Sequence, residues 1–158
     1  MTATTIEQTI ETYGIENWGA GYFSVNRKGN LVVHPAENDT KSAADVKEII
    51  DNLKKRGINA PVLLRFPQLI VGQIRKLQKA FKNSIKEYEY NSRHMCVYPM
   101  KVNQNRAVVE EYLKEGSRYD FGLEAGSKAE LYAALAMEQS DDSLLVLNGF
   151  KDEEFIRL

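Results

Sequence analysis

The sequence has few of the residues that build covalent or metal-bound cross-links. Its 158 residues include one cysteine, Cys96, so no disulfide can form within the chain. The two histidines, His34 and His94, are far apart in sequence and are expected on the surface. With one cysteine they give no metal site of the Cys/His type. Sparse cysteine is typical of a reducing compartment, so we expect a cytoplasmic protein.

An excess of charge of one sign is also lacking. The 21 basic residues nearly balance the 22 acidic ones, and the formal net charge is −1. Nucleic acids and anionic membranes attract strongly basic surfaces, so neither is expected as a partner. No apolar run is long enough to cross a bilayer, and no basic region followed by an apolar run marks a signal peptide. The apolar fraction of 43% is typical of a soluble globular protein.

Residues 1–59 predict a segment with a β-hairpin and a helix. Two β-rich runs, at residues 22–26 and 31–34, flank a Gly29-Asn30 turn. Residues 43–56 carry apolar side chains at helical spacing. Ser42 is expected to cap the start of this helix, and Gly57 to end it in a left-handed conformation. The apolar positions of the helix are Val46, Ile49, Ile50 and Leu53.

From residue 60 onward, strand-like and helix-like segments alternate. A short apolar run at 61–66 and strand-like segments at 96–102, 121–124 and 143–147 are each followed by a helical pattern. This alternation predicts an α/β fold with a parallel sheet. Strand ends spaced by about two dozen residues favour the compact units of a (β/α) barrel. The first of these helices is expected to pack through Ile70, Ile74, Leu77, Phe81 and Ile85.

Three candidate functional residues close successive predicted strands: Lys101, Glu124 and Asn148. Functional groups of parallel sheets lie at the carboxyl ends of the strands. Lys101 stands in an apolar run, and a buried lysine amine is a good nucleophile toward carbonyl groups. The alternative is a lysine that reaches into solvent. Glu124 could pair with this lysine or line a cofactor pocket, or be a solvated strand-end carboxylate.

The loops after the second and third of these strands carry further candidates. Ser127 and Glu130 have the spacing of a capping box at a helix start. Gly126 and the Ser127 hydroxyl could approach an anion there, although capping alone explains Ser127 equally well. Lys151, after Gly149, could meet a substrate carboxylate or lie on the surface.

Residues 97–104, with the sequence VYPMKVNQ, resemble the Y-P-[I/M]-K-V-N-Q segment of biosynthetic arginine decarboxylases. In that family the lysine forms a Schiff base with pyridoxal phosphate. Four other blocks resemble the family in the same order, so the likeness covers nearly the whole chain. More distantly, the order is similar to that of the alanine-racemase-like decarboxylases of ornithine and diaminopimelate. The four blocks are WGAGYFSVN from Trp18, LRFP from Leu64, GLEAGSKAEL from Gly122 and NGFKDE from Asn148.

The resemblance implies a fold, a reaction and a cofactor. The fold is a barrel of the alanine-racemase-like type with a β-rich domain. Residues 60–158 would form its first three or so βα units, and the hairpin within residues 1–59 would belong to the β-rich part. Lys101 would carry pyridoxal 5′-phosphate, with Glu124 and Ser127 also binding it. The reaction would convert arginine to agmatine and carbon dioxide in polyamine (spermidine) biosynthesis. Magnesium and homo-oligomer formation are implied by the resemblance alone.

The chain also departs from the family. Family enzymes are several times longer, and the remaining barrel strands, the glycine-rich phosphate loop and the carboxyl-terminal domain have no counterpart here. We therefore expect an amino-terminal fragment, truncated at its carboxyl end and inactive by itself. One alternative is a free-standing, non-catalytic remnant that acts as a binding or assembly partner. Another is a related decarboxylase of another basic amino acid. The downstream reading frame would separate the fragment from the remnant.

Overall fold

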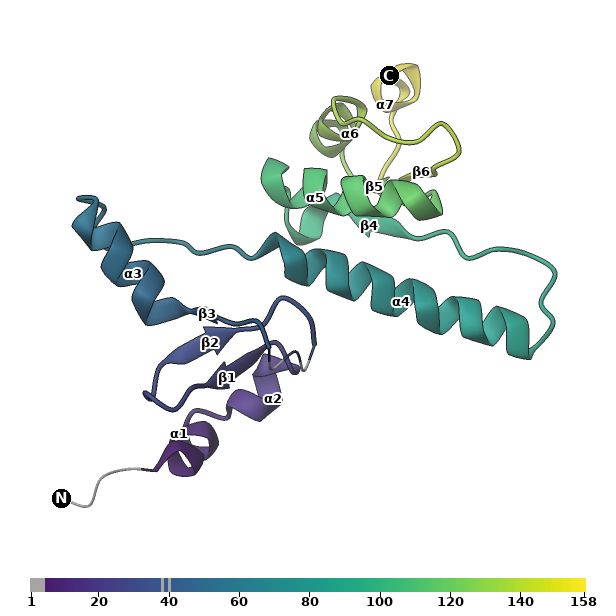
Figure 1. Cartoon of the computed structure of the whole chain (residues 1–158). Helices are drawn as coiled ribbons and strands as arrows, with labels where there is room; N and C mark the ends of the chain where they lie inside the picture. The colour runs from purple at the N-terminus through teal and green to yellow at the C-terminus, as the bar shows by residue number, and fades with distance from the viewer. Residues whose placement is uncertain (1–4, 38, 40) are drawn as a thin grey trace. The chain divides into compact units, whose positions relative to one another are not determined.

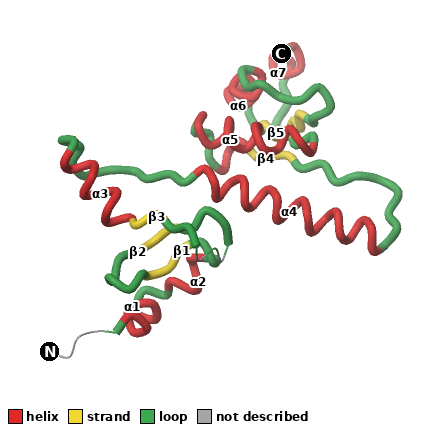
Figure 2. Tube along the Cα trace, in the orientation of Figure 1, coloured by secondary structure: helices red, strands yellow, loops and turns green. Residues whose placement is uncertain are grey.

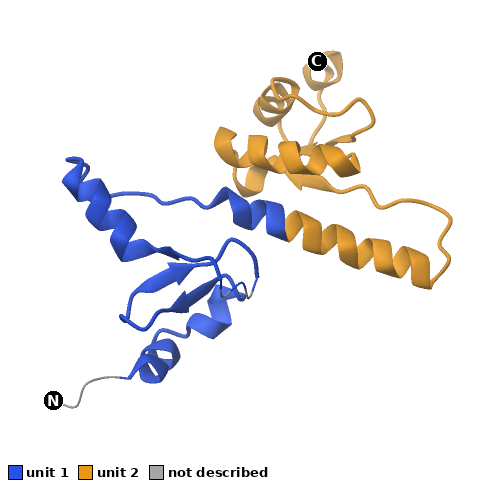
Figure 3. Cartoon of the chain, viewed as in Figure 1, with its two compact units in different colours: residues 1–72 blue, residues 73–158 orange. Residues whose placement is uncertain are grey.

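The computed structural model describes residues 5–37, 39 and 41–158, and it has an α/β fold. The chain forms two compact units, residues 1–72 and 73–158, which Figure 3 colours separately. Each unit contains its own three-stranded sheet. In the described ranges, no helix is both long enough and apolar enough to span a membrane.

The first unit is built on an antiparallel sheet in the order β1-β2-β3 (Figures 1 and 2). The predicted hairpin is confirmed: Phe23 pairs with Val33 across β1 and β2, and Gly29 takes the left-handed conformation in the turn. The core here includes Tyr22, Val32 and Val33. The elements are α1 (Ile6–Thr12), α2 (Ile15–Gly19), β1 (Phe23–Val25), β2 (Leu31–Val33), β3 (Ala44–Asp45) and α3 (Val46–Lys55).

Helix α3 begins later than predicted, and the expected Ser42 cap is wrong. Pairing of β3 with β2 keeps the chain extended up to Asp45. The Asp45 side chain then accepts a hydrogen bond from the Glu48 amide at 3.1 Å and caps the helix. The predicted end is confirmed: Gly57 has φ +79°, and its amide donates to the Lys54 carbonyl at 2.9 Å.

The second unit contains a parallel sheet in the order β4-β5-β6, as the strand–helix alternation predicts. Helix α4 (Pro67–Glu87) precedes the sheet and runs across the boundary between the units. A 3-10 turn, Met100–Val102, follows β4, and another, Ser117–Tyr119, follows α5. The other elements are β4 (Val97–Pro99), α5 (Arg106–Gly116), β5 (Gly122–Ala125), α6 (Lys128–Leu135), β6 (Leu145–Leu147) and α7 (Glu153–Arg157).

The central strand β5 is buried along its whole length. Leu123 and Ala125 have no exposed surface, and Ala125 packs with Leu131 and Phe155. Gly122 is required by the close approach of the next strand, because a Cβ there would lie 1.8 Å from the Leu144 carbonyl oxygen. Glu124 is the charged residue of this otherwise apolar buried strand.

Two predicted strands differ from the structure. The run at 96–102 forms a strand only at Val97–Pro99, because the chain then turns and buries Met100 completely. Residues 61–66 form no strand, and Leu63 is 73% exposed. On the helix that follows, Ile74 is buried as predicted, whereas Leu77 is 41% exposed.

Both histidines are more enclosed than predicted. His34 is 8% exposed, with Nε2 2.7 Å from the Ser24 hydroxyl, so its predicted surface position is wrong. His94 is partly buried and stacks on Phe81 with ring centroids 3.6 Å apart. Burial lowers the pKa of His94, because the charged ring would lose hydration.

Candidate functional site

The carboxyl ends of the three parallel strands meet at one edge of the second unit's sheet. Pro99 of β4 lies beside Glu124 of β5, and Glu124 lies beside Val146 of β6. Lys101 comes two residues after Pro99, and Asn148 directly follows β6. The register therefore brings Lys101, Glu124 and Asn148 to one edge, where parallel sheets place their functional groups.

Lys101 is exposed and lies in the 3-10 turn after β4. Of the two alternatives, a buried lysine and a lysine that reaches into solvent, the structure has the second, because the turn directs Met100 into the core instead. Within the described part of the chain, the Lys101 amine takes part in no hydrogen bond or ion pair. Its amine is thus both accessible and uncommitted.

Glu124 is 4% exposed, so the alternative of a solvated strand-end carboxylate is wrong. Its Oε1 accepts a hydrogen bond of 2.9 Å from the Asn148 side-chain amide. Its Oε2 is buried and has no hydrogen-bond partner in the described structure. A buried acceptor without a partner costs about 1–3 kcal/mol. An unfilled acceptor therefore lies at the same edge as the uncommitted amine of Lys101.

Ser127 caps α6, and its hydroxyl accepts from the Glu130 amide at 3.2 Å. The predicted capping box forms only in part, because the Glu130 carboxylate accepts from the Gly126 amide at 2.6 Å instead of the Ser127 amide. The other oxygen of Glu130 accepts from Gln104 at 3.3 Å. Glu130 thereby joins the loop after β4 to the start of α6.

The loop after β6 is fixed against the loop after β5. Gly149 has φ +79°, and a Cβ there would lie 2.3 Å from the Gly126 carbonyl oxygen. Lys128 donates to Asp152 at 2.7 Å, which raises the pKa of Lys128 and lowers that of Asp152. The Lys151 amine donates to the Gly149 carbonyl at 3.0 Å. The loops after β4, β5 and β6 are thus joined to one another by hydrogen bonds and close packing at this edge.

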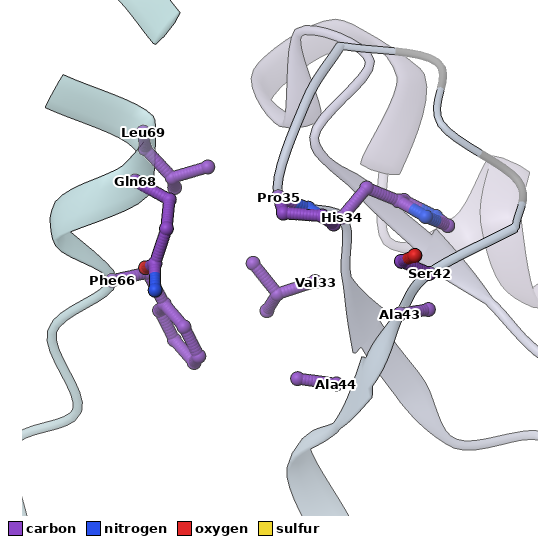
Figure 4. Close-up of a pocket in the computed structure, with 9 residues that line it drawn as sticks. All are labelled: Val33, His34, Pro35, Ser42, Ala43, Ala44, Phe66, Gln68 and Leu69. Atoms are coloured by element: carbon purple, nitrogen blue, oxygen red, sulfur yellow. The ribbon is translucent and has the colours of Figure 1, made fainter. Parts of the chain in front are cut away.

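The first unit contains a separate pocket of about 260 Å³, shown in Figure 4. It includes none of the candidate residues predicted from the sequence, and most of its lining is apolar. His34 is the titratable residue in the lining. The pocket is lined by Val33, His34, Pro35, Ser42, Ala43, Ala44, Phe66, Gln68 and Leu69.

Residues 5–37, 39 and 41–158 contain no group of three or more His, Cys, Asp or Glu residues that could hold a metal ion.

Comparison with known families identifies the class of the chain. Residues 71–158, which carry the parallel sheet and its edge, match the family model described as "Pyridoxal-dependent decarboxylase, pyridoxal binding domain". The match covers more than half of the chain, so the chain belongs to this family. Pyridoxal phosphate is the cofactor of the family.

Individual relatives show which decarboxylases the chain is similar to. The chain is 49% identical over 148 residues to a biosynthetic arginine decarboxylase of Rhodopirellula baltica, covering 94% of this chain and 22% of the relative. It is 44% identical over 153 residues to that of Phocaeicola vulgatus, covering 97% and 24%. The crystal structure of the biosynthetic arginine decarboxylase from Campylobacter jejuni superposes with a TM-score of 0.80 at 39% identity, covering 92% and 23%. The chain thus spans about a quarter of the length of these relatives.

Proposed function

We propose that this chain provides the cofactor-carrying lysine of a pyridoxal-phosphate-dependent arginine decarboxylase, with Lys101 as the point of attachment. The observation that carries the proposal is an exposed, uncommitted Lys101 amine at the same sheet edge as buried Glu124, whose Oε2 has no partner among the described residues. An amine must be free to react with a carbonyl group. The named relatives, all biosynthetic arginine decarboxylases, support arginine as the substrate.

Three residues of the chain fit the needs of the cofactor. Lys101 Nζ would hold it covalently. Glu124 would offer Oε2 as an acceptor, and Ser127 would offer an exposed hydroxyl at the start of α6, where the helix dipole is positive. Bound pyridoxal phosphate supplies an electron sink that lets arginine lose carbon dioxide and leave as agmatine. The Lys101 amine, released when substrate binds, would return a proton to the α-carbon.

The activity is proposed for a protein that contains this chain together with the remaining length of its relatives. The chain alone is expected to be inactive, because it spans 22–24% of them. Other expectations also stay predictions: the division into residues 1–59 and 60–158, the partial alanine-racemase-like barrel, the homo-oligomer, the magnesium requirement and the cytoplasmic location. Agmatine formation would place the reaction in polyamine biosynthesis.

Reduction of the loaded enzyme with borohydride tests the attachment site. The reduced pyridoxyl group is expected on the peptide that contains Lys101. Lys101→Arg keeps a positive charge but cannot hold the cofactor in the same way. We expect it to lower the rate of agmatine formation by at least about three orders of magnitude, as loss of a covalent catalyst does.

Lys151 is the matched control, because it follows β6 of the same parallel sheet and its amine already donates to the Gly149 carbonyl. Lys151→Arg should leave the labelled peptide unchanged. Label on Lys151, or on any lysine other than Lys101, would disprove the assignment.

A further inference from the structure

The contact between Asn148 and Glu124 is the polar contact at the sheet edge that reaches the buried carboxylate. Asn148 Nδ2 donates to Glu124 Oε1 at 2.9 Å, across 24 residues of sequence. An asparagine amide can donate to a carboxylate but adds no charge beside it. One carboxylate oxygen is therefore occupied, and the other keeps its full capacity to accept.

The main chain holds Asn148 firmly in this position. The backbone amide of Asn148 donates to the Ala125 carbonyl at 2.9 Å, which extends the β5–β6 pairing by one residue. Gly149 follows in a left-handed turn packed against Gly126. Because the backbone of Asn148 and that of Gly149 are both held in place, the side-chain amide of Asn148 defines where the Glu124 carboxylate lies.

We infer that Asn148 is a positioning residue, which orients the Glu124 carboxylate so that Oε2 is directed to the cofactor. This inference rests on the proposed function. The carboxylate on β5 accepts one bond from the protein and would accept its second from the cofactor or from the Lys101 amine. Residues 97–158 supply both the residue that acts and the residue that orients it.

Three variants of the loaded enzyme separate orientation from simple packing. Asn148→Ala removes one hydrogen bond to a charged group and should weaken pyridoxal phosphate binding by about ten- to hundredfold. Asn148→Asp is nearly isosteric but sets a second carboxylate beside Glu124, so it should be worse than Asn148→Ala at neutral pH. If Asn148 only filled space, the isosteric change would be the milder one, and this order would overturn the inference.

The third variant exchanges the two groups, as Glu124→Gln combined with Asn148→Asp. The amide and carboxylate can again bond, so the thermal midpoint of the chain should recover toward the wild-type value. Cofactor affinity should stay low, because the carboxylate now lies after β6 instead of on β5. Recovery of both would show that the position of the carboxylate is irrelevant, and would also overturn the inference.

Asn30 is the matched control, because its Nδ2 donates to Asp45 Oδ2 at the same 2.9 Å but in the first unit. Asn30→Ala should leave cofactor affinity unchanged, and an equal loss would overturn the inference. The proposed function fails separately: it fails if borohydride labels a lysine other than Lys101. It survives if Lys101 is labelled and the Asn148 variants bind normally, and then the positioning role alone is wrong.

Discussion

The two units each contain a three-stranded sheet, but the two sheets place the residues that follow their strands differently. In the antiparallel sheet, successive strands end at opposite edges, so residues that follow them are separated. In the parallel sheet, the residues that follow β4, β5 and β6 all reach one edge. Strand direction therefore decides whether candidate functional groups collect, even when the number of strands is the same.

The carboxylates of the two units also differ in how many hydrogen bonds they accept. Asp45 accepts side-chain hydrogen bonds from Asn30 and Asn26 and also caps α3. Its pKa is lowered, mainly by the bond from Asn30. Glu124 accepts one side-chain bond and keeps a buried oxygen without a partner in the described structure. A carboxylate in a structural role is fully satisfied, whereas Glu124 retains capacity for another group.

The largest effect that we expect on stability is from the core of the parallel sheet. Leu123→Ala removes a completely buried side chain and should lower the free energy of unfolding by about 2–5 kcal/mol. Denaturation followed by circular dichroism measures the loss. Leu63→Ala is the control, because Leu63 is 73% exposed and should change stability by less than about 0.5 kcal/mol.

The same variant tests whether the two units are energetically separate. The single tryptophan, Trp18, lies in the first unit, so its fluorescence follows that unit. We expect Leu123→Ala to shift the Trp18 transition less than the circular dichroism transition. Equal shifts would show that the units unfold as one cooperative body, and the comparison between them would lose its energetic meaning.

Two glycines with the same backbone angle give the next prediction. Gly57 in the first unit and Gly149 in the second both have φ +79°, but only Gly149 would bring a Cβ against backbone. Gly57→Ala should cost about 1–2 kcal/mol from the left-handed conformation alone. Gly149→Ala should cost about 1–3 kcal/mol more, because the Cβ overlaps the Gly126 carbonyl. Equal losses in urea unfolding would mean that the loop after β6 moves freely.

Sequence could predict the features that depend on near neighbours. The hairpin turn at Gly29, the helix end at Gly57 and the strand–helix alternation all follow from local conformational preferences. The apolar run around Lys101 could not tell which side chain turns inward, and Met100 took that place. The Asn148–Glu124 bond joins residues 24 positions apart, so no local pattern contains it.

The smallest effect that we expect concerns one ion pair in each unit. Arg75 donates to both oxygens of Glu115, at 2.7 and 3.2 Å, and Glu115 is 5% exposed. The first unit's Lys28–Glu48 pair is exposed at both ends. Solvent screens exposed pairs, so Lys28→Gln should change stability little at any pH.

The Arg75–Glu115 pair should make stability depend on pH in a definite direction. The bond from Arg75 is the main cause that lowers the pKa of Glu115 below its usual 4.5. A carboxylate with a lowered folded-state pKa stabilises the fold above the unfolded-state pKa, and this stability is lost as pH falls through the folded-state pKa. Arg75→Gln removes the cause, so the variant should be less stable than wild type at neutral pH, and the gap should close on acidification. Urea unfolding at several pH values measures it. A gap that stays constant down to acidic pH would show that Arg75 stabilises α4 and α5 through its aliphatic carbons rather than its charge.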